Sequence, residues 1–350
     1  MRAGTKRRGG LFLGMLCLIA VGGAVFGGTV SRTPLIGALA GVINGVMVLG
    51  AIVGAEMFLP QTRLGHALER APFLVTFAVR FFVYHALILV VIGSNLGRQL
   101  VIAVLPIGDP VPAAGEQAWR LPPKVAIVVT AMFLPPFILL TQLTRLIGER
   151  TLRDIVLGRY HRPRTEERFF LFVDIAGSTP LAERIGPAAV HRFLGRVFRI
   201  ASAPIDDHGG EVYQYVGDEM VITWTASAAR QRARPLACFF AIAQALERAA
   251  LEFERDFGVT PRLRAALHAG PVIAGEVGES RRAIVFHGDV MNTASRLEQA
   301  SRDLERRFLV SGDALERLDG LAAYALEDLS LRRLRGRAEP VHVYAVTTKP

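Results

Sequence analysis

Hydrophobic residues are distributed unevenly along this chain of 350 residues. Before residue 148 they form long uninterrupted runs, whereas after it they alternate with polar residues in shorter segments. Four of the early runs are long enough to cross a bilayer, since about 20 apolar residues span its hydrocarbon core. They cover Leu11–Val30, Leu35 to about Leu59, a stretch within Phe73–Ile92, and about Val125–Ile147. The pattern predicts an all-α transmembrane bundle over residues 1–147.

Two details of this bundle allow alternatives. Lys6, Arg7 and Arg8 precede the first run, as in a signal peptide, but no clear cleavage site precedes the second run. The apolar run Val101–Ile107 either extends the third span or lies at the outer surface with the Pro-rich loop Asp109–Pro123.

Positive charge predicts the orientation of the bundle. Lysine or arginine residues cluster before the first span, in the loop 60–72 and directly after the fourth span. Positive loops stay in the cytoplasm, and four spans place all three segments on that side. We therefore expect a multi-pass protein of the inner or plasma membrane, with the lipid bilayer as a partner and a cytoplasmic second half.

Small and ionisable residues mark positions inside the predicted spans. Gly37, Gly41 and Gly45 are four residues apart, which favours close helix packing within one bundle over a dimer contact. Arg80 and His85 lie within the third span, where such groups bind a ligand or face a polar bundle interior.

Residues 148–165 form the predicted helical connector between the two halves. Their apolar residues recur at near-helical spacing, and Gly158 and Pro163 end the helix. This segment either pairs with its copy in a second chain or lies on the inner leaflet.

The second half, residues 166–350, predicts an α+β domain. Its pattern indicates alternating strands and helices with a tight turn around Gly217–Asp218, and helices on one face of the sheet. Among the other expected elements are a strand at Phe169–Val173, a helix at Leu181–Asp206, and a helix beginning near Val290.

Composition narrows the possible functions. The net charge of +10 is compatible with anionic lipid, a phosphorylated substrate or nucleic acid. No basic stripe is interleaved with aromatic residues, so we expect no nucleic-acid partner. Cys17 and Cys238 give no disulfide framework or cysteine metal site, and the histidines lack metal-ligand spacing.

Two aspartates carry the candidate chemistry. Asp174 and Asp218 each end an apolar, strand-like run beside a glycine. Carboxylates at a sheet edge bind hard cations, and two of them are the minimum for a two-metal phosphoryl or nucleotidyl transfer site.

Three motifs together resemble the catalytic domain of the class III adenylate and guanylate cyclases. They are FVDIAGST, YVGDE and HGDVMNTASRLE, in that order, over about residues 166–347. The resemblance implies a ferredoxin-like core that acts as an antiparallel homodimer, with ATP or GTP as substrate at the interface.

The resemblance also implies roles for single residues. Asp174 and Asp218 would hold two Mg²⁺ or Mn²⁺ ions per site, assisted by the backbone carbonyl of Ile175. Asn292 and Arg296 would come from the partner chain, to orient the ribose and to stabilise charge on the α-phosphate. They are four residues apart, so one helix face carries both.

The remaining substrate-binding positions depart from the family pattern. Arg335 stands where the family has a lysine that binds the terminal phosphates, and arginine can do this bidentately. Gln214 and Val285 replace the Lys–Asp or Lys–Thr pair that reads the base. Ser178 replaces a commonly aromatic residue. Asp289 is expected to cap the helix near Val290 and not to bind metal.

These features favour a membrane-anchored adenylate cyclase that makes 3′,5′-cyclic AMP and pyrophosphate for intracellular signalling. One alternative is a guanylate cyclase. The other is a catalytically silent receptor, which the departures at Gln214 and Val285 favour and the four motif residues oppose.

Overall fold

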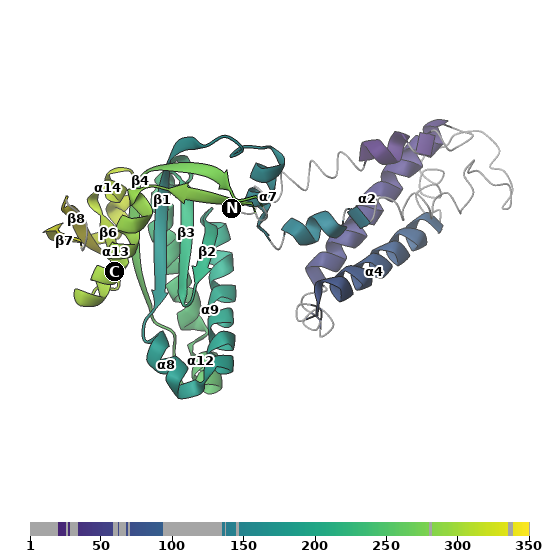
Figure 1. Cartoon of the computed structure of the whole chain (residues 1–350). Helices are drawn as coiled ribbons and strands as arrows, with labels where there is room; N and C mark the ends of the chain where they lie inside the picture. Colours follow the sequence, from purple (N-terminus) through teal and green to yellow (C-terminus); the bar gives the residue numbers. More distant parts are fainter. Residues whose placement is uncertain are drawn as a thin grey trace. The chain divides into compact units, whose positions relative to one another are not determined.

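The computed structural model describes residues 20–25, 27–28, 34–58, 62, 68, 71–93, 135–136, 138–144, 147–279, 282–334 and 339–349. The chain forms two compact units, with the division between Leu152 and Arg153. Figure 1 shows the helices of the first unit and the sheet of the second. The cyclase-like half thus has the predicted α+β character, and a helical region precedes it.

Two long helices form much of the described N-terminal unit. α2 spans Pro34–Phe58 and α4 spans Phe73–Gly93, where the sequence predicts the second and third spans. Arg80 is buried in this unit, and the ring of His85 stacks on Phe81 with centroids 5.6 Å apart. The apolar contacts of the unit centre on Ile52, Tyr84, Ile88 and Ile138.

Glycines allow two helical segments of this unit to approach closely. A Cβ atom added at Gly23 would collide with the backbone of Gly41, and one added at Gly27 would collide with the backbone of Gly37. Glycine is therefore required at this contact, and the pattern in α2 serves packing within the chain.

The membrane interpretation remains a prediction. Within the described residues, no helix is both long enough and apolar enough to cross a bilayer. The run Val101–Ile107 and the loop Asp109–Pro123 lie outside the described residues, as do most of the first and fourth predicted spans.

An eight-stranded sheet organises the C-terminal unit (Figure 1). Its order is β2-β3-β1-β4-β6-β8-β7, and β5 pairs with β4. The strands are β1 (Arg164–Ile175), β2 (Glu211–Val216), β3 (Glu219–Thr225), β4 (Leu263–Val277), β5 (Ala283–His287), β6 (Phe308–Ser311), β7 (Tyr324–Arg332) and β8 (Val341–Thr348).

Helices cover both faces of this sheet, so the expectation of helices on one face is wrong. Side chains of β1 alternate between the faces. Phe169, Leu171 and Val173 join the larger core with α9 (Pro187–Asp207), α11 (Arg234–Arg248) and α12 (Ala250–Phe257). Phe170 and Phe172 face the opposite way, towards α13 (Asp289–Asp303).

The predicted elements are otherwise recovered with local differences. The helix expected at Leu181–Asp206 is two helices, α8 (Ser178–Ile185) and α9, because Gly186 has φ 80° and Pro187 begins the second. Residues 263–277 form one continuous strand, β4, whose end makes a hairpin with β5.

The connector enters the sheet through a short turn. α7 spans Glu149–Val156, and the chain leaves the helix at Gly158, which has φ 61°. Glycine adopts this conformation without strain, so the predicted helix end is confirmed. Tyr160 is then buried against Phe170 and Phe286, and β1 begins at Arg164.

Candidate active site

Asp174 and Asp218 lie together at one end of the central strands. Asp174 is next to last in β1, and Asp218 occupies the turn between β2 and β3. β1 pairs with β3, with Val173 opposite Met220, so the turn falls beside the end of β1. The two carboxyl groups share a hydrogen bond, and the Asp174 side chain is 4 % exposed. The sequence prediction of a carboxylate pair is therefore reproduced by the fold.

Acidic groups around this pair hold protons more tightly than usual. The pKa of Asp174 is raised to about 6, first because burial disfavours its charge and then because Asp218 is adjacent. The pKa of Glu219, the first residue of β3, is raised to about 7 by burial and by the charges of Glu298 and Asp174. Such shifts cluster where a protein binds cations or performs catalysis.

Two arginines face Asp174 from different elements. Arg264 is its cross-strand partner on β4, and its Nη2 lies 3.6 Å from Asp174 Oδ2. Arg302, near the end of α13, places Nη2 3.2 Å from the same oxygen. Arg302 also binds Glu298 one turn earlier, at 3.3 Å. The carboxylates Asp174, Asp218, Glu219 and Glu298 outnumber these guanidinium groups, which leaves excess negative charge.

The donor set fits divalent cations in part. Across the described residues, no three His, Cys, Asp or Glu side chains form a ready metal cage. Asp174 and Asp218 supply two adjacent carboxylates, however, and oxygen donors of this kind suit Mg²⁺ or Mn²⁺, which keep water and substrate phosphates among their ligands. The backbone next to Ile175 is held by a hydrogen bond. The amide of the following residue, Ala176, donates to the carbonyl of Arg262 at 2.8 Å.

Asn292 and Arg296 lie on the outer face of α13. Asn292 is exposed and Arg296 is partly exposed. At about 100° per residue they are about 40° apart around the helix, whereas Glu298 is about 120° from Asn292 and about 160° from Arg296. Arg302, which contacts Asp174 directly, is about 80° from Asn292 and about 120° from Arg296 around the helix, so the predicted Asn–Arg pair lies on a different part of the helix surface.

Gln214 lies on β2 and Val285 lies on β5, and the residue next to each of them is an aromatic residue in contact with the other. Tyr213 of β2 and Phe286 of β5 have ring centroids 5.1 Å apart. Gln214 is exposed and Val285 is half-buried. β2 and β5 therefore come together at this aromatic contact. The pairing of β2 with β3 is irregular between Val212 and Gln214.

Other predicted residues have simple positions. Arg335 lies outside the described residues. Asp289 is the first residue of α13 and not its cap, since Gly288 precedes it and the Asp289 carboxylate accepts a hydrogen bond from Thr293 at 3.1 Å. The expected capping role is therefore wrong.

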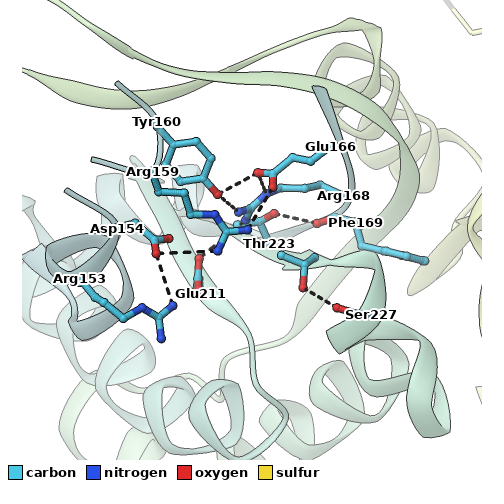
Figure 2. A network of polar contacts seen from close by, with 11 residues as sticks. Arg153, Asp154, Arg159, Tyr160, Glu166, Arg168, Phe169, Glu211, Thr223 and Ser227 are labelled. Atoms are coloured by element: carbon cyan, nitrogen blue, oxygen red, sulfur yellow. Dashed lines mark hydrogen bonds and ion pairs between the residues drawn. The ribbon is translucent and has the colours of Figure 1, made fainter. Parts of the chain in front are cut away.

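A second polar cluster joins the connector to the sheet (Figure 2). Arg168 on β1 is 3 % exposed and donates to Glu166 and to the Tyr160 hydroxyl, both at 2.8 Å. Tyr160 in turn donates to Glu166 at 2.9 Å. Asp154 of α7 binds Arg153 and Arg159 next to this group. The connector is thus fixed to β1, the strand that carries Asp174.

A match to a protein-family model identifies this domain. The adenylate and guanylate cyclase catalytic domain matches residues 161–348, which is more than half of the chain. The chain belongs to this family. Its α+β unit is therefore a nucleotidyl cyclase catalytic domain, and the resemblance read from the three motifs is confirmed.

Named relatives of this cyclase domain are bacterial. Adenylate cyclase 2 of Rhizobium meliloti (strain 1021) is 38% identical over 226 residues, which cover 64% of this chain and 62% of that protein. Adenylate cyclase of Mycobacterium bovis (strain ATCC BAA-935 / AF2122/97) is 33% identical over 167 residues, or 47% of this chain and 35% of that protein. The chain thus spans less than two thirds of these relatives.

A solved structure has the same fold. A bacterial light-regulated adenylyl cyclase superposes with a TM-score of 0.54 at 20% identity, covering 63% of this chain and 64% of that chain. At this identity the likeness concerns the cyclase fold alone.

The sequence did not identify several contacts of the cyclase site. Ser178, at the start of α8, donates its hydroxyl hydrogen bond to the Asp218 carboxylate. Glu298 and Arg302 reach Asp174 from a helix more than a hundred residues downstream. Their i, i+4 spacing is visible in the sequence, but it describes any exposed helical ion pair. Only the strand register and the placement of α13 show that this pair belongs to the site.

Proposed function

We propose that this chain is an adenylate cyclase that converts ATP into 3′,5′-cyclic AMP and pyrophosphate at the interface of a homodimer. The observation that supports this most directly is the adjacency of buried Asp174, near the end of β1, and half-buried Asp218, in the β2–β3 turn, within a cyclase-family domain. The relatives named adenylate cyclase in two bacteria favour ATP as the substrate.

In the reaction, the ribose 3′-oxygen forms a bond to the α-phosphorus, and the bond from that phosphorus to the β-phosphate oxygen breaks. Pyrophosphate leaves with the bonding electrons, and the 3′-hydroxyl proton passes to solvent or a phosphate oxygen. Two bound Mg²⁺ or Mn²⁺ ions would lower the pKa of the 3′-hydroxyl and neutralise charge on the triphosphate.

The residues of the chain would hold and orient the reactants. Asp174 and Asp218, with the carbonyl of Ile175, would bind the metal ions on one chain. Asn292 and Arg296 of the second chain would bind the ribose and the charged α-phosphate. The surface of α13 supports this division, because these two side chains and the contact with Asp174 lie on different parts of it.

The base is the least specified part of the substrate. Gln214 can donate and accept hydrogen bonds, whereas Val285 can do neither. A guanylate cyclase therefore remains the alternative, and the choice of ATP rests on the named relatives. Arg335 would bind the terminal phosphates.

We also propose that the N-terminal half anchors the enzyme in the inner or plasma membrane, with the cyclase domain in the cytoplasm. The long apolar runs and the positive flanks in the sequence support this. Extraction of the expressed chain from membranes should require detergent, and release by alkaline carbonate would contradict a spanning anchor.

The activity is tested with the full chain in detergent, Mn²⁺ and each nucleotide separately. ATP should give cyclic AMP, and the Asp218→Ala variant should give none. Cyclic GMP formation from GTP at a higher kcat/KM would change the substrate to GTP. Inactivity with both nucleotides in a folded chain would favour a silent receptor.

A further inference from the structure

Arg302 contacts the Asp174 carboxylate and a carboxylate of its own helix. Its Nη2 lies 3.2 Å from Asp174 Oδ2, and its Nε and Nη2 lie 3.3 and 3.4 Å from the two oxygens of Glu298. One guanidinium group thus bridges a carboxylate of the proposed metal site and a carboxylate of α13. Arginine suits this position because its planar fork has donors for two carboxylates at once.

The three side chains differ in their freedom to move. Glu298 and Asp174 are 2 % and 4 % exposed, so both carboxylates are fixed and costly to leave without a cation. Arg302 is 50 % exposed and emerges near the last turn of α13. Movement of the guanidinium towards Glu298 alone would release Asp174 and still leave Glu298 paired.

Arg264 reaches Asp174 from the neighbouring strand, at a longer distance than Arg302 does. It is the cross-strand partner of Asp174 on β4, its side chain is 28 % exposed, and its Nε has no hydrogen-bond partner. Pairing of β1 with β4 keeps the backbone of Arg264 beside Asp174, whereas Arg302 has Glu298 as a second partner and is therefore the cation better placed for exchange.

We propose that Arg302 is a positioning residue that occupies Asp174 until a divalent cation displaces it, and that Glu298 receives the displaced guanidinium. This inference rests on the proposed function, since it assumes that Asp174 and Asp218 bind metal. A divalent cation would have to displace Arg302 in order to bind Asp174, whether or not nucleotide or a second chain is present.

The test measures Mn²⁺ affinity directly, from the electron paramagnetic resonance signal of free Mn²⁺ titrated into the full chain in detergent. Arg302→Met removes the competing cation, so it should tighten Mn²⁺ binding by about two- to five-fold, the range that one exposed ion pair corresponds to. Arg302→Lys keeps the charge and should stay close to the wild type. Unchanged or weaker binding in Arg302→Met would overturn the inference.

A matched control separates this effect from general charge. Arg306 is also exposed and binds Glu327 at 2.7 Å on β7. Arg306→Met removes the same charge from the chain without touching Asp174, so its Mn²⁺ affinity should equal that of the wild type. An equal gain in Arg306→Met and Arg302→Met would mean that net charge alone is responsible, which contradicts the exchange.

The role of Glu298 is tested by a double-variant cycle. Glu298→Gln should weaken Mn²⁺ binding in the wild-type background. Arg302 then keeps only the Asp174 carboxylate of its two partners, so it competes with Mn²⁺ more strongly. In the Arg302→Met background the same change should have a smaller effect. An equal effect in both backgrounds would show that Glu298 does not act through Arg302.

Failure of the proposed metal site gives a different result. If Asp174→Asn and Asp218→Asn bind Mn²⁺ as tightly as the wild type, the metal lies elsewhere and the proposed function loses its metal site. If both variants lose binding and Arg302→Met shows no gain, the exchange alone is wrong.

Discussion

The guanidinium of Arg168 lies over the ring of Phe286, with its central carbon 4.4 Å from the ring centroid. This contact links β1, which receives the connector through Tyr160, to β5, which carries Val285. Cation–π contacts are stronger when both partners are buried, and both are buried here. Arg168 thus connects the segment around Tyr160, where the chain enters the domain, with β5, the strand expected to contact the base.

Loss of Arg168 should destabilise the cyclase domain. Arg168→Met leaves Glu166 and the ring of Phe286 without the buried cation, and breaking such a pair typically costs about 3 kcal/mol of unfolding free energy. Tyr160→Phe removes one hydroxyl from the same cluster and should cost about 1 kcal/mol. Thermal unfolding of the full chain measures both. Equal losses would mean that the charge of Arg168 contributes little.

A fragment that begins at residue 158 should be more stable than one that begins at residue 166. The longer fragment keeps Tyr160, whose hydroxyl binds Arg168 and whose carbonyl accepts from the amide of Glu276 at 3.0 Å. The shorter one exposes the apolar surface that Tyr160 covers. Melting temperatures of the two fragments provide the comparison, and identical values would show that the connector is not part of the folded domain.

Two inactive variants should restore activity when combined. Asp218→Ala damages the metal half of the site, and Arg296→Ala damages the half supplied by the second chain. In an equal mixture, half of the dimers are mixed and each mixed dimer has one intact site, so about a quarter of wild-type activity should return.

The matched control for this recovery combines two substitutions in the same half of the active site, the half that binds metal. A mixture of Asp218→Ala with Asp174→Ala should stay inactive, because both sites of the mixed dimer then lack one aspartate. Cyclic AMP formation by the equal mixture, obtained by co-expression, is the measurement. Recovery in the control, or none in the first mixture, would contradict a shared site.

Stability of the metal-free chain should fall as the pH rises. The pKa values of about 6 for Asp174 and about 7 for Glu219 exceed those of the same acids in the unfolded chain, near 4. Their stabilising contribution is therefore complete below about pH 4 and is lost as the pH rises through about 6 to 7.

Removal of a neighbouring charge tests this pH dependence. Asp218→Asn should raise the melting temperature, measured in EDTA, more at pH 8 than at pH 5, because Asp174 is ionised only at the higher pH. An equal change at both pH values would show that the acids are not coupled.

The base preference should respond to the two departing positions. Gln214→Lys combined with Val285→Asp installs the Lys–Asp pair that the family resemblance implies for adenine, and should raise the ratio of kcat/KM for ATP over GTP by about ten-fold, the value of one charged hydrogen bond. Each single change should give less, because it leaves one charge unpaired. A ratio unchanged in the double variant would place base recognition elsewhere.

The local features of the site could be predicted and the long-range ones could not. Asp174 and Asp218 were identifiable because each ends an apolar run beside a glycine, whereas Asn292 and Arg296 were named only through the resemblance of their motif to the cyclase family. The contacts of Asp174 with Arg264 and Arg302 depend on how β4 and α13 pack against β1, which a single sequence does not encode in any local pattern. The break at Gly186 was a local signal, a glycine followed by proline, that the helical periodicity on either side obscured.

α13 has consequences for cooperativity between the two sites of the proposed dimer. One part of this helix touches Asp174 of its own chain through Arg302, while another part carries the pair proposed to serve the other chain. α13 is one continuous helix of 15 residues, so a displacement of one part is passed to the other. Filling one active site would therefore shift the residues that complete the other, so the second nucleotide would bind with an affinity set by the first.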